Sequence, residues 1–336
     1  MLERILIVGP NWVGDMVMAQ SLFILLAKNN PGCKIDVLAP AWTLPLLQHM
    51  AEVSQPIEIP LKRGELGFAA RYKLGRKLRE GQYQQVILLP NSLKSALIPF
   101  FANIPLRTGY IGEQRWGLLN DLRRLDKQKL PMTVQRFVAL GLEKNTQVPP
   151  VCPEPRLNVK KLDLTSVADR FELDIRGKKI LGLCPGAEYG EAKRWPVEHF
   201  AAVAQQRKKR GWEIWLFGSQ RDQAVCAQIN QTAGDCCIDF SGRTNMNDAI
   251  NLLALTHCVL SNDSGLMHVA AALDKPLVAV YGSSDPGFTP PLNKHARILS
   301  LGLDCSPCFK RVCPFGHTRC LQDITPDQVL DLLPLG

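Results

Sequence analysis

The first residues that could carry chemistry lie in a loop between an apolar strand and a helix. The segment Gly9-Pro-Asn-Trp-Val-Gly-Asp15 places a carboxylate shortly after the apolar run Ile5–Val8. An Asp in this position can be a helix N-cap or a base that takes a proton from a hydroxyl. The five-residue step from Gly9 to Gly14 does not match the dinucleotide fingerprint G-x-G-x-x-G. The loop therefore indicates a cap or a catalytic base and argues against NAD binding.

A second segment, Ser261-Asn-Asp-Ser-Gly-Leu-Met-His268, follows another short apolar run. The N–H groups of a helix start bind anions, and Gly265 lets a ligand approach the backbone. His268 would lie one turn into the helix, within reach of a phosphate oxygen. The alternative is an ordinary helix that is capped by Asp263 or Ser264, with His268 packed against the sheet.

Two further loops have similar alternatives. Residues 185–196 contain two glycines, Gly186 and Gly190, before Lys193 and Arg194. These two cations could clamp a diphosphate, or the loop could simply be solvated. In the loop 217–222, Asp222 could bind ribose hydroxyls, although we favour a helix cap there.

Two other clusters are less specific. Residues 62–79 are rich in Lys and Arg, and Leu66, Ala70, Leu74 and Leu78 recur at helical spacing. This predicts an amphipathic helix whose cationic face is either solvated or docked on an anionic acceptor or lipid surface. The cysteines near the C-terminus have the spacing C-x₂-C-x₄-C-x₆-C, which resembles a metal site but also suits free or cross-linked thiols. They are Cys305, Cys308, Cys313 and Cys320.

These segments need elements to position them. Apolar runs at 5–8, 35–38 and 85–89 alternate with helical patterns, and the alternation restarts at 179–184, 213–217, 258–260 and 277–281. Such alternation predicts α/β structure with two parallel, doubly wound sheets, joined by the Pro-rich stretch 148–155. Ligands bind such sheets at the carboxyl ends of the strands, and a cleft between two such domains is the expected site.

Composition agrees with two globular domains. The chain has 336 residues, of which 46% are hydrophobic, and no apolar stretch or basic leader indicates a membrane span or signal peptide. Its 11 cysteines, an odd number, favour a reducing cytoplasmic compartment. The net charge of +9 lies entirely within residues 1–170, with 23 Lys and Arg against 14 Asp and Glu. This half is therefore expected to face an anionic partner.

Together, the loops 9–15, 185–196 and 262–268 and the cysteine-rich tail resemble the bacterial ADP-heptose:lipopolysaccharide heptosyltransferases, the heptosyltransferase II branch more than the first. The resemblance spans essentially the whole chain. It implies the GT-B fold: two Rossmann-like doubly wound domains facing a central cleft. We assign the acceptor domain to residues 1–160 and the ADP-sugar domain to 175–322. A C-terminal helix at 323–336 is expected to pack back on the first domain.

The resemblance also implies an inverting, metal-independent transfer from ADP-L-glycero-β-D-manno-heptose to the first heptose of the lipopolysaccharide inner core. No cofactor is implied, and the enzyme would be cytoplasmic, contacting the inner face of the inner membrane. Asp15 matches the general base and Lys193 the diphosphate-binding lysine. The donor-binding positions are Asp263, Ser264, Gly265, His268, Met246, Asp222 and Gly186. The acceptor candidates are Lys62, Arg63, Asn91, Lys94, Arg115 and Arg136.

The chemistry of the residues is compatible with this function. Asp15 would take the acceptor proton, while Lys193, His268 and a helix N-terminus would place positive potential at the departing diphosphate. Glu188 and Tyr189 depart from the pair expected in the heptosyltransferase I branch. The rival functions are transfer of the first heptose to the 3-deoxy-octulosonate-lipid A acceptor, a non-catalytic nucleic-acid-binding protein and a nicotinamide oxidoreductase.

Overall fold

The computed structural model describes residues 2–62, 64–144 and 149–334. The chain forms two compact units that divide between Pro155 and Arg156, at the end of the predicted linker. The predicted boundary at residue 160 lies slightly too late, because residues from Arg156 onward belong to the second unit. The α/β prediction is confirmed, with one parallel sheet in each unit.

The first sheet has the strand order β3-β2-β1-β4-β5-β6, and all its pairings are parallel. Its strands are β1 (Arg4–Val8), β2 (Lys34–Ala39), β3 (Val53–Glu58), β4 (Gln85–Leu88), β5 (Leu106–Tyr110) and β6 (Asp121–Arg123). The central strand β1 is an unbroken apolar run because helices cover both faces of the sheet, and Ile5–Val8 are buried.

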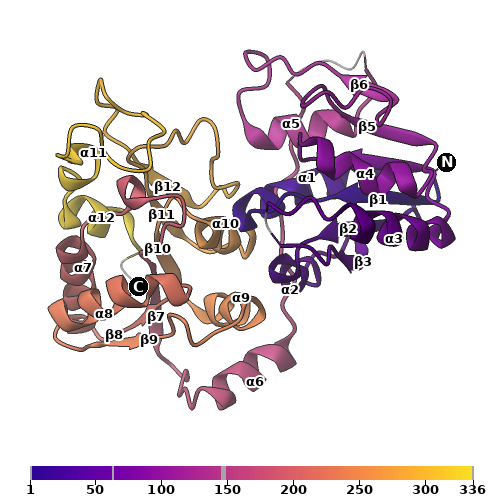
Figure 1. Ribbon diagram of the computed structural model, residues 1–336. Helices are drawn as coiled ribbons and strands as arrows, with labels where there is room; N and C mark the ends of the chain where they lie inside the picture. The colour runs from indigo at the N-terminus through magenta and orange to yellow at the C-terminus, as the bar shows by residue number, and fades with distance from the viewer. Residues whose placement is uncertain (1, 63, 145–148, 335–336) are drawn as a thin grey trace. The chain divides into compact units, whose positions relative to one another are not determined.

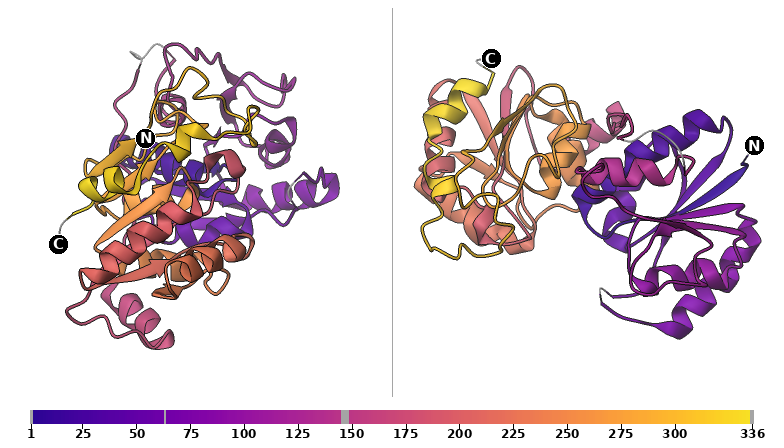
Figure 2. Two further views of the ribbon diagram at one scale, coloured as in Figure 1. Left: turned by 90° about the vertical axis from the view of Figure 1, so that its left-hand side faces the viewer. Right: turned by 90° about the horizontal axis from the view of Figure 1, so that it is seen from above.

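Helices α1 and α5 pack together on one face of this sheet, and α3 and α4 pack together on the other (Figures 1 and 2). The helices are α1 (Val13–Asn29), α2 (Leu44–Leu47), α3 (Phe68–Leu78), α4 (Leu93–Phe101) and α5 (Thr133–Leu140), with 3₁₀ turns η1 (Ala41–Thr43) and η2 (Arg79–Gly81). The predicted basic helix therefore exists as α3, but it begins at Phe68, so Leu66 lies in the preceding loop.

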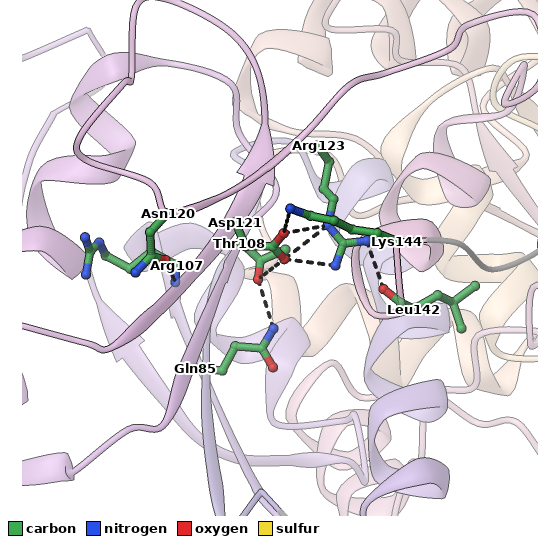
Figure 3. A network of polar contacts seen from close by, with 8 residues as sticks. All are labelled: Gln85, Arg107, Thr108, Asn120, Asp121, Arg123, Leu142 and Lys144. Carbon is green, nitrogen blue, oxygen red and sulfur yellow. Dashed lines mark hydrogen bonds and ion pairs between the residues drawn. The ribbon is translucent and has the colours of Figure 1, made fainter.

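A polar network joins the outer strands of the first sheet (Figure 3). Gln85 Nε2 donates to Thr108 Oγ1 at 3.0 Å, and this hydroxyl donates to Asp121 Oδ2 at 3.0 Å. Arg123 and Lys144 form ion pairs with the same carboxylate at 2.9 and 3.1 Å. Because each buried polar group has a partner, the network fixes the edge of the sheet without leaving a carboxylate unpaired.

The second sheet repeats the same topology in the order β12-β11-β10-β7-β8-β9, again with parallel pairings. Its strands are β7 (Lys179–Cys184), β8 (Trp212–Leu216), β9 (Cys237–Asp239), β10 (Cys258–Asn262), β11 (Leu277–Val280) and β12 (Ala296–Leu299). Residues 1–155 and 156–336 therefore repeat one strand order, which accounts for the restart of the apolar pattern in the sequence.

Helices α7, α8 and α12 lie on one face of the second sheet, and α9 and α10 lie on the other (Figure 1). The helices are α6 (Lys161–Arg170), α7 (Val197–Lys209), α8 (Gln223–Thr232), α9 (Met246–Leu255), α10 (Gly265–Ala272), α11 (Arg319–Gln322) and α12 (Pro326–Leu332), with 3₁₀ turns η3 (Glu191–Lys193) and η4 (Gln220–Asp222). Within the described residues, no helix is long and apolar enough to cross a membrane.

The C-terminal helix α12 packs on α7 in the core of the second unit, where Val329 and Leu330 are buried (Figure 2). The guanidinium of Arg207 on α7 donates to the carbonyls of Leu330 and Leu333 at 3.3 and 3.1 Å. The apolar side of α12 thus completes the second core, and the expectation that this helix also packs back on the first domain stays a prediction.

Candidate active site

The order of the strands predicts a ligand site at the carboxyl ends of the central strands of each sheet. In the first sheet the strand order reverses at β1 and β4: β2 and β3 are added on one side of β1, and β4, β5 and β6 on the other. In the second sheet the order reverses in the same way between β7 and β10. Loops leaving adjacent strands at such a switch point diverge to opposite faces and leave a crevice. The loops after β1, β4, β7 and β10 hold most of the residues predicted to bind ligands.

Asp15 lies in the first turn of α1, directly after the loop that leaves β1. The helix has Trp12 as its N-cap residue, so the interpretation of Asp15 as the N-cap is wrong. Asp15 is instead the third residue of the helix and is half-buried. A carboxylate is favoured in the first turn by the helix dipole, which stabilises its charged form. Asp15 therefore lies at the switch point of the first sheet, and its role as a base stays a prediction.

A pocket of about 580 Å³, part of it open to solvent, lies beside this loop in the first unit. Trp42 forms part of the wall, and its indole N–H donates to the Asn11 carbonyl at 3.0 Å. Of the predicted acceptor residues, Lys62 and Lys94 line the pocket. The other lining residues are Val8, Gly9, Asn11, Pro40, Ile59, Leu61, Gly64, Glu65, Arg71, Pro90, Ser92, Ser95 and Ile98.

Two buried arginines support the loops around this pocket. Arg71 was expected on an exposed cationic face, but it is buried and donates to the carbonyls of Leu66, Lys94 and Glu65. Loop carbonyls close to the helix start satisfy its guanidinium, and burial lowers its pKa. An arginine remains charged despite this shift, so Arg71 adds positive charge behind the pocket.

Arg115 corrects a prediction. It was proposed to bind the acceptor, but it is 1% exposed and donates to the Pro90 carbonyl at 2.8 Å and to Asn91 Oδ1 at 3.3 Å. It also donates to the Tyr110 carbonyl. Arg115 therefore positions the loop between β4 and α4, and Asn91 remains exposed on that loop.

The last two acceptor candidates do not join the pocket. Arg136 donates to the carbonyls of Leu130 and Pro131 at 2.9 and 3.1 Å, which orders the segment before α5. It is absent from the described lining of the pocket. Arg63 lies outside the described residues.

In the second unit, Asn262 at the end of β10 joins the two loops of the switch point. Its Nδ2 donates to the Pro185 carbonyl at 2.7 Å, and its Oδ1 accepts from the Trp195 N–H at 3.1 Å. Asn262 is fully buried. It therefore holds both ends of the loop that carries Lys193.

Lys193 and Asp263 form the central pair of this switch point. The Lys193 ammonium lies 2.5 Å from Asp263 Oδ2, and the side chains are only 16% and 5% exposed. The ring of Tyr189 lies beneath the same ammonium, with its centroid 5.1 Å away. A pair buried to this extent is strong only while both charges are present. The structure thus brings together two residues that the sequence separates by 70 positions.

Helix α10 begins beside this pair. Ser264 is its N-cap residue and Gly265 its first helical residue, so Asp263 is not the cap. The first N–H groups of a helix have no partners within the helix and suit an anion. Burial lowers the pKa of His268 to about 4, although the charge of Asp263 opposes the shift. Without a ligand the His268 ring is therefore neutral at neutral pH and can donate a hydrogen bond; its role in placing positive potential at a diphosphate stays a prediction.

Asp222 occupies the N-cap position of α8, but its side chain makes no cap hydrogen bond to that helix; it closes a capping box whose N-cap residue is Ser219. Its Oδ2 accepts from the N–H and the hydroxyl of Ser219 at 2.9 and 2.7 Å. Arg194 lies 3.7 Å from the other carboxylate oxygen. Gly186 is required by this packing, because a Cβ at Gly186 would lie 2.6 Å from Asp222 Cγ. The capping role of Asp222 leaves contact with ribose as a prediction.

Met246 is the first residue of α9 and is half-buried. Its helix is capped by Asn245, which accepts from the Asp248 N–H at 2.9 Å. The position of Met246 after β9 places it at the same edge of the sheet as the other loops. Its contact with adenine remains a prediction.

The cysteines are all free thiols. Burial raises the pKa of Cys226 and of Cys258 to about 12, which makes both unreactive. Cys305, Cys308, Cys313 and Cys320 are half-buried, and the described residues contain no group of three or more side chains arranged to hold a metal ion.

Two contributors were missed from the sequence. Trp42 follows the last residue of β2 after only Pro40 and Ala41. An aromatic residue just past the end of a strand is the signal that could have identified it. Asn262 lies within the segment 261–268, but its residue type alone did not indicate a role. Its signal is a polar side chain at the end of an otherwise apolar strand.

Comparison with known proteins agrees with this geometry. A sequence model described as glycosyltransferase family 9 (heptosyltransferase) matches residues 71–319. The chain is 45% identical over 339 residues to lipopolysaccharide heptosyltransferase 2 of Salmonella typhimurium, covering 98% of this chain and 97% of that protein. The corresponding protein of Escherichia coli is 44% identical with the same coverage. The structure of E. coli ADP-heptose lps heptosyltransferase II matches with a TM-score of 0.87 at 42% identity, covering 98% of this chain and 97% of that one.

Proposed function

The chain belongs to glycosyltransferase family 9, the heptosyltransferases, and we propose that it transfers L-glycero-D-manno-heptose from ADP-heptose to the first heptose of the lipopolysaccharide inner core. The identity of 45% and 44%, over nearly the full length, to two proteins named lipopolysaccharide heptosyltransferase 2 supports this choice over transfer of the first heptose. The Lys193–Asp263 pair at the start of α10 is the observation on which the chemistry rests.

The pair suits a nucleotide sugar. A sugar diphosphate carries oxyanions that accept from an ammonium and, next to them, hydroxyls that donate to a carboxylate. Lys193 would bind the diphosphate and Asp263 the heptose, each exchanging part of their mutual contact for the ligand. The α10 N-terminus, with Ser264 and Gly265, would receive the phosphate charge, and neutral His268 would donate one hydrogen bond.

The transfer itself needs one base and one stabilised leaving group. Asp15 would take the proton of the acceptor hydroxyl while its oxygen forms the new bond to the anomeric carbon. The bond from that carbon to the diphosphate breaks, and ADP leaves with the electron pair. Lys193 and the helix N-terminus would stabilise the charge that develops on the diphosphate, so the step needs no metal.

The pocket of the first unit would take the acceptor. Lys62 and Lys94 line it, and Arg71 adds positive charge behind it, which suits a phosphorylated, acidic saccharide. Trp42 offers an exposed ring against which a sugar could pack. The cleft between the domains and its closure around both substrates remain predictions. We also propose a cytoplasmic location and no role for nucleic acid.

The test is mass analysis of the acceptor after incubation with ADP-heptose. We expect one added heptose on an acceptor that already carries the first heptose, with release of ADP that depends on both substrates and persists in EDTA. Addition only to an acceptor that lacks heptose would assign the chain to the first transfer instead. A thermal-shift assay adds a separate check: ADP should raise the melting temperature and NAD should not.

A further inference from the structure

A group of large apolar side chains is exposed on the first unit, over α3 and α4. Phe68 and Tyr72 on α3 and Phe100 on α4 are between 43% and 56% exposed, as is Leu66 just before α3. We call these four residues and the half-buried Phe101 the aromatic patch. A contiguous apolar patch on the surface of a soluble protein marks a site of interaction more often than a packing defect.

The rings of the aromatic patch are held in place. Phe101 lies at the centre, with the ring centroids of Phe68, Tyr72 and Phe100 at 5.2, 5.3 and 5.8 Å in edge-on geometry. Phe68 and Tyr72 are four residues apart and therefore share one side of α3. The patch is thus preformed, and docking would cost little side-chain entropy.

Cations flank the aromatic patch along α3. Lys73, Arg76 and Lys77 are exposed on α3, with Arg76 one turn after Tyr72, and the exposed Arg79 directly follows the helix. The segment Gly67–Arg79 contains no Asp or Glu. Arg79 is anchored, because its Nε donates to the Phe101 carbonyl at 2.9 Å. The exposed Glu80 follows this segment, so the surface is predominantly cationic. An apolar edge beside a predominantly cationic arc is the pattern of helices that lie in the interface of an anionic bilayer.

The patch is also continuous with the acceptor pocket. Leu66 of the patch accepts through its carbonyl from Arg71 Nε at 2.5 Å. Arg71 in turn donates to the carbonyl of Lys94 at 3.0 Å, and both residues line the pocket. The loop that ends the patch therefore forms the rim of the pocket, so a molecule could have its lipid at the patch and its saccharide in the pocket.

We propose that the aromatic patch and the α3 cations dock the first unit on an anionic lipid bilayer. The rings would lie at the headgroup level and the cations would contact lipid phosphates. A second copy of the chain is disfavoured as the occupant, because two such faces would bring like charges together. Nucleic acid would leave the apolar side chains in water. The proposal rests on the proposed function for its orientation toward a lipid-linked acceptor.

Sedimentation of the full-length protein with vesicles tests the docking directly. We expect binding to vesicles of phosphatidylcholine that contain roughly one-third phosphatidylglycerol, and little binding to phosphatidylcholine alone, because the cations are attracted to an anionic surface. The variant Phe68→Ser/Phe100→Ser and the variant Lys73→Gln/Lys77→Gln should each bind about tenfold more weakly.

Two matched controls lie in the second unit. Leu162→Ser removes an apolar side chain that is 77% exposed on α6, and Lys208→Gln/Lys209→Gln removes two exposed cations on α7. Both should bind vesicles like the unaltered protein. Equal binding of the patch variants and the controls would overturn the proposal. So would a patch variant that converts a dimer to a monomer in gel filtration, or a loss of nucleic-acid binding without a loss of vesicle binding.

Activity separates this proposal from the proposed function. With a delipidated acceptor in solution, the patch variants should transfer heptose at the unaltered rate. With the same acceptor embedded in anionic vesicles, their rate should fall about tenfold. No transfer by the unaltered protein in either assay would reject the proposed function, while the vesicle sedimentation would still decide the docking.

Discussion

The two switch points share one topology but differ in how their charges are used. In the second unit, Lys193 is already paired with Asp263, and Arg194 lies near Asp222. In the first unit, within its described residues, no ion pair engages Lys62 or Lys94, and Arg71 is bonded only to carbonyls. A paired site selects a ligand that can replace both charges, whereas a pocket whose two lysines have no ion-pair partner attracts anions of many shapes, although Glu65 also lines it. The difference suits a defined nucleotide sugar on one side and a large acidic acceptor on the other.

The largest effect is expected at Asp15, the one residue of the first switch point to which we assign a chemical step. Asp15→Asn keeps the shape of the side chain but cannot take a proton, so turnover should fall by roughly a thousandfold or more. ADP affinity, measured by calorimetry, should stay within about twofold because the nucleotide is assigned to the other unit. Loss of ADP binding together with turnover would break the division of labour between the two sites.

His268 tests the low polarity of the second switch point through pH. Its pKa is about 4 in the folded protein, below the ordinary value of 6.5. As the pH falls from 6.5 to 4, His268 takes up a proton in the unfolded chain but stays neutral in the folded chain. The free energy of unfolding therefore decreases as the pH decreases. The expected loss is about 3 kcal/mol, fully developed below pH 4 and absent above pH 6.5.

The measurement is urea unfolding of the unaltered protein and of His268→Gln from pH 4 to 7.5. The variant lacks the titrating ring, so its free energy of unfolding should decrease by about 3 kcal/mol less than that of the unaltered protein over this pH range. A folded-state titration of His268 near pH 6.5, observed by NMR, would contradict the buried neutral ring.

Lys193 tests the pairing itself. Lys193→Gln should lower kcat about a hundredfold by removing the charge at the leaving diphosphate. It should also destabilise the fold by about 3 kcal/mol, because Asp263 is left buried without its partner. Adding Asp263→Asn should restore much of the stability but none of the activity. The exposed Lys209→Gln serves as a control, and equal effects of the two lysine changes would refute the assignment.

The smallest effects are expected in the acceptor pocket. Lys62→Gln and Lys94→Gln should each raise the KM for a phosphorylated acceptor about fivefold, since each removes one charge contact in a pocket that is partly open to solvent. The KM for ADP-heptose should not change. If a dephosphorylated acceptor shows the same increase, the two lysines do not bind phosphate and the contrast between the sites is weaker than we propose.

The central strands were predictable because burial on both faces requires an unbroken apolar run, as in Ile5–Val8. The edge strand β3 was not, since Ser54, Gln55 and Pro56 leave it polar and partly exposed. The sequence motif containing Asp263 was also visible, but its pairing with Lys193 depends on the adjacency of β7 and β10. No local pattern encodes that adjacency.

Arg71 shows the opposite failure. Within a run of cations it reads as one more solvated charge, yet it is buried against the carbonyls of Leu66, Glu65 and Lys94. Those carbonyls come from a loop and from the start of α4, whose approach no propensity predicts. Arg115 fails for the same reason, because its partners follow β4 and end β5.

Trp195 connects the switch point of the second unit to the segment before α12. Its backbone N–H donates to Asn262 at 3.1 Å, and its indole N–H donates to the Ile324 carbonyl at 2.9 Å. Ile324 directly precedes Thr325, the N-cap residue of α12. Substitutions around Ile324 and α12 should therefore appear in genetic screens as alleles with weakened nucleotide affinity, although the substituted side chains do not contact the nucleotide.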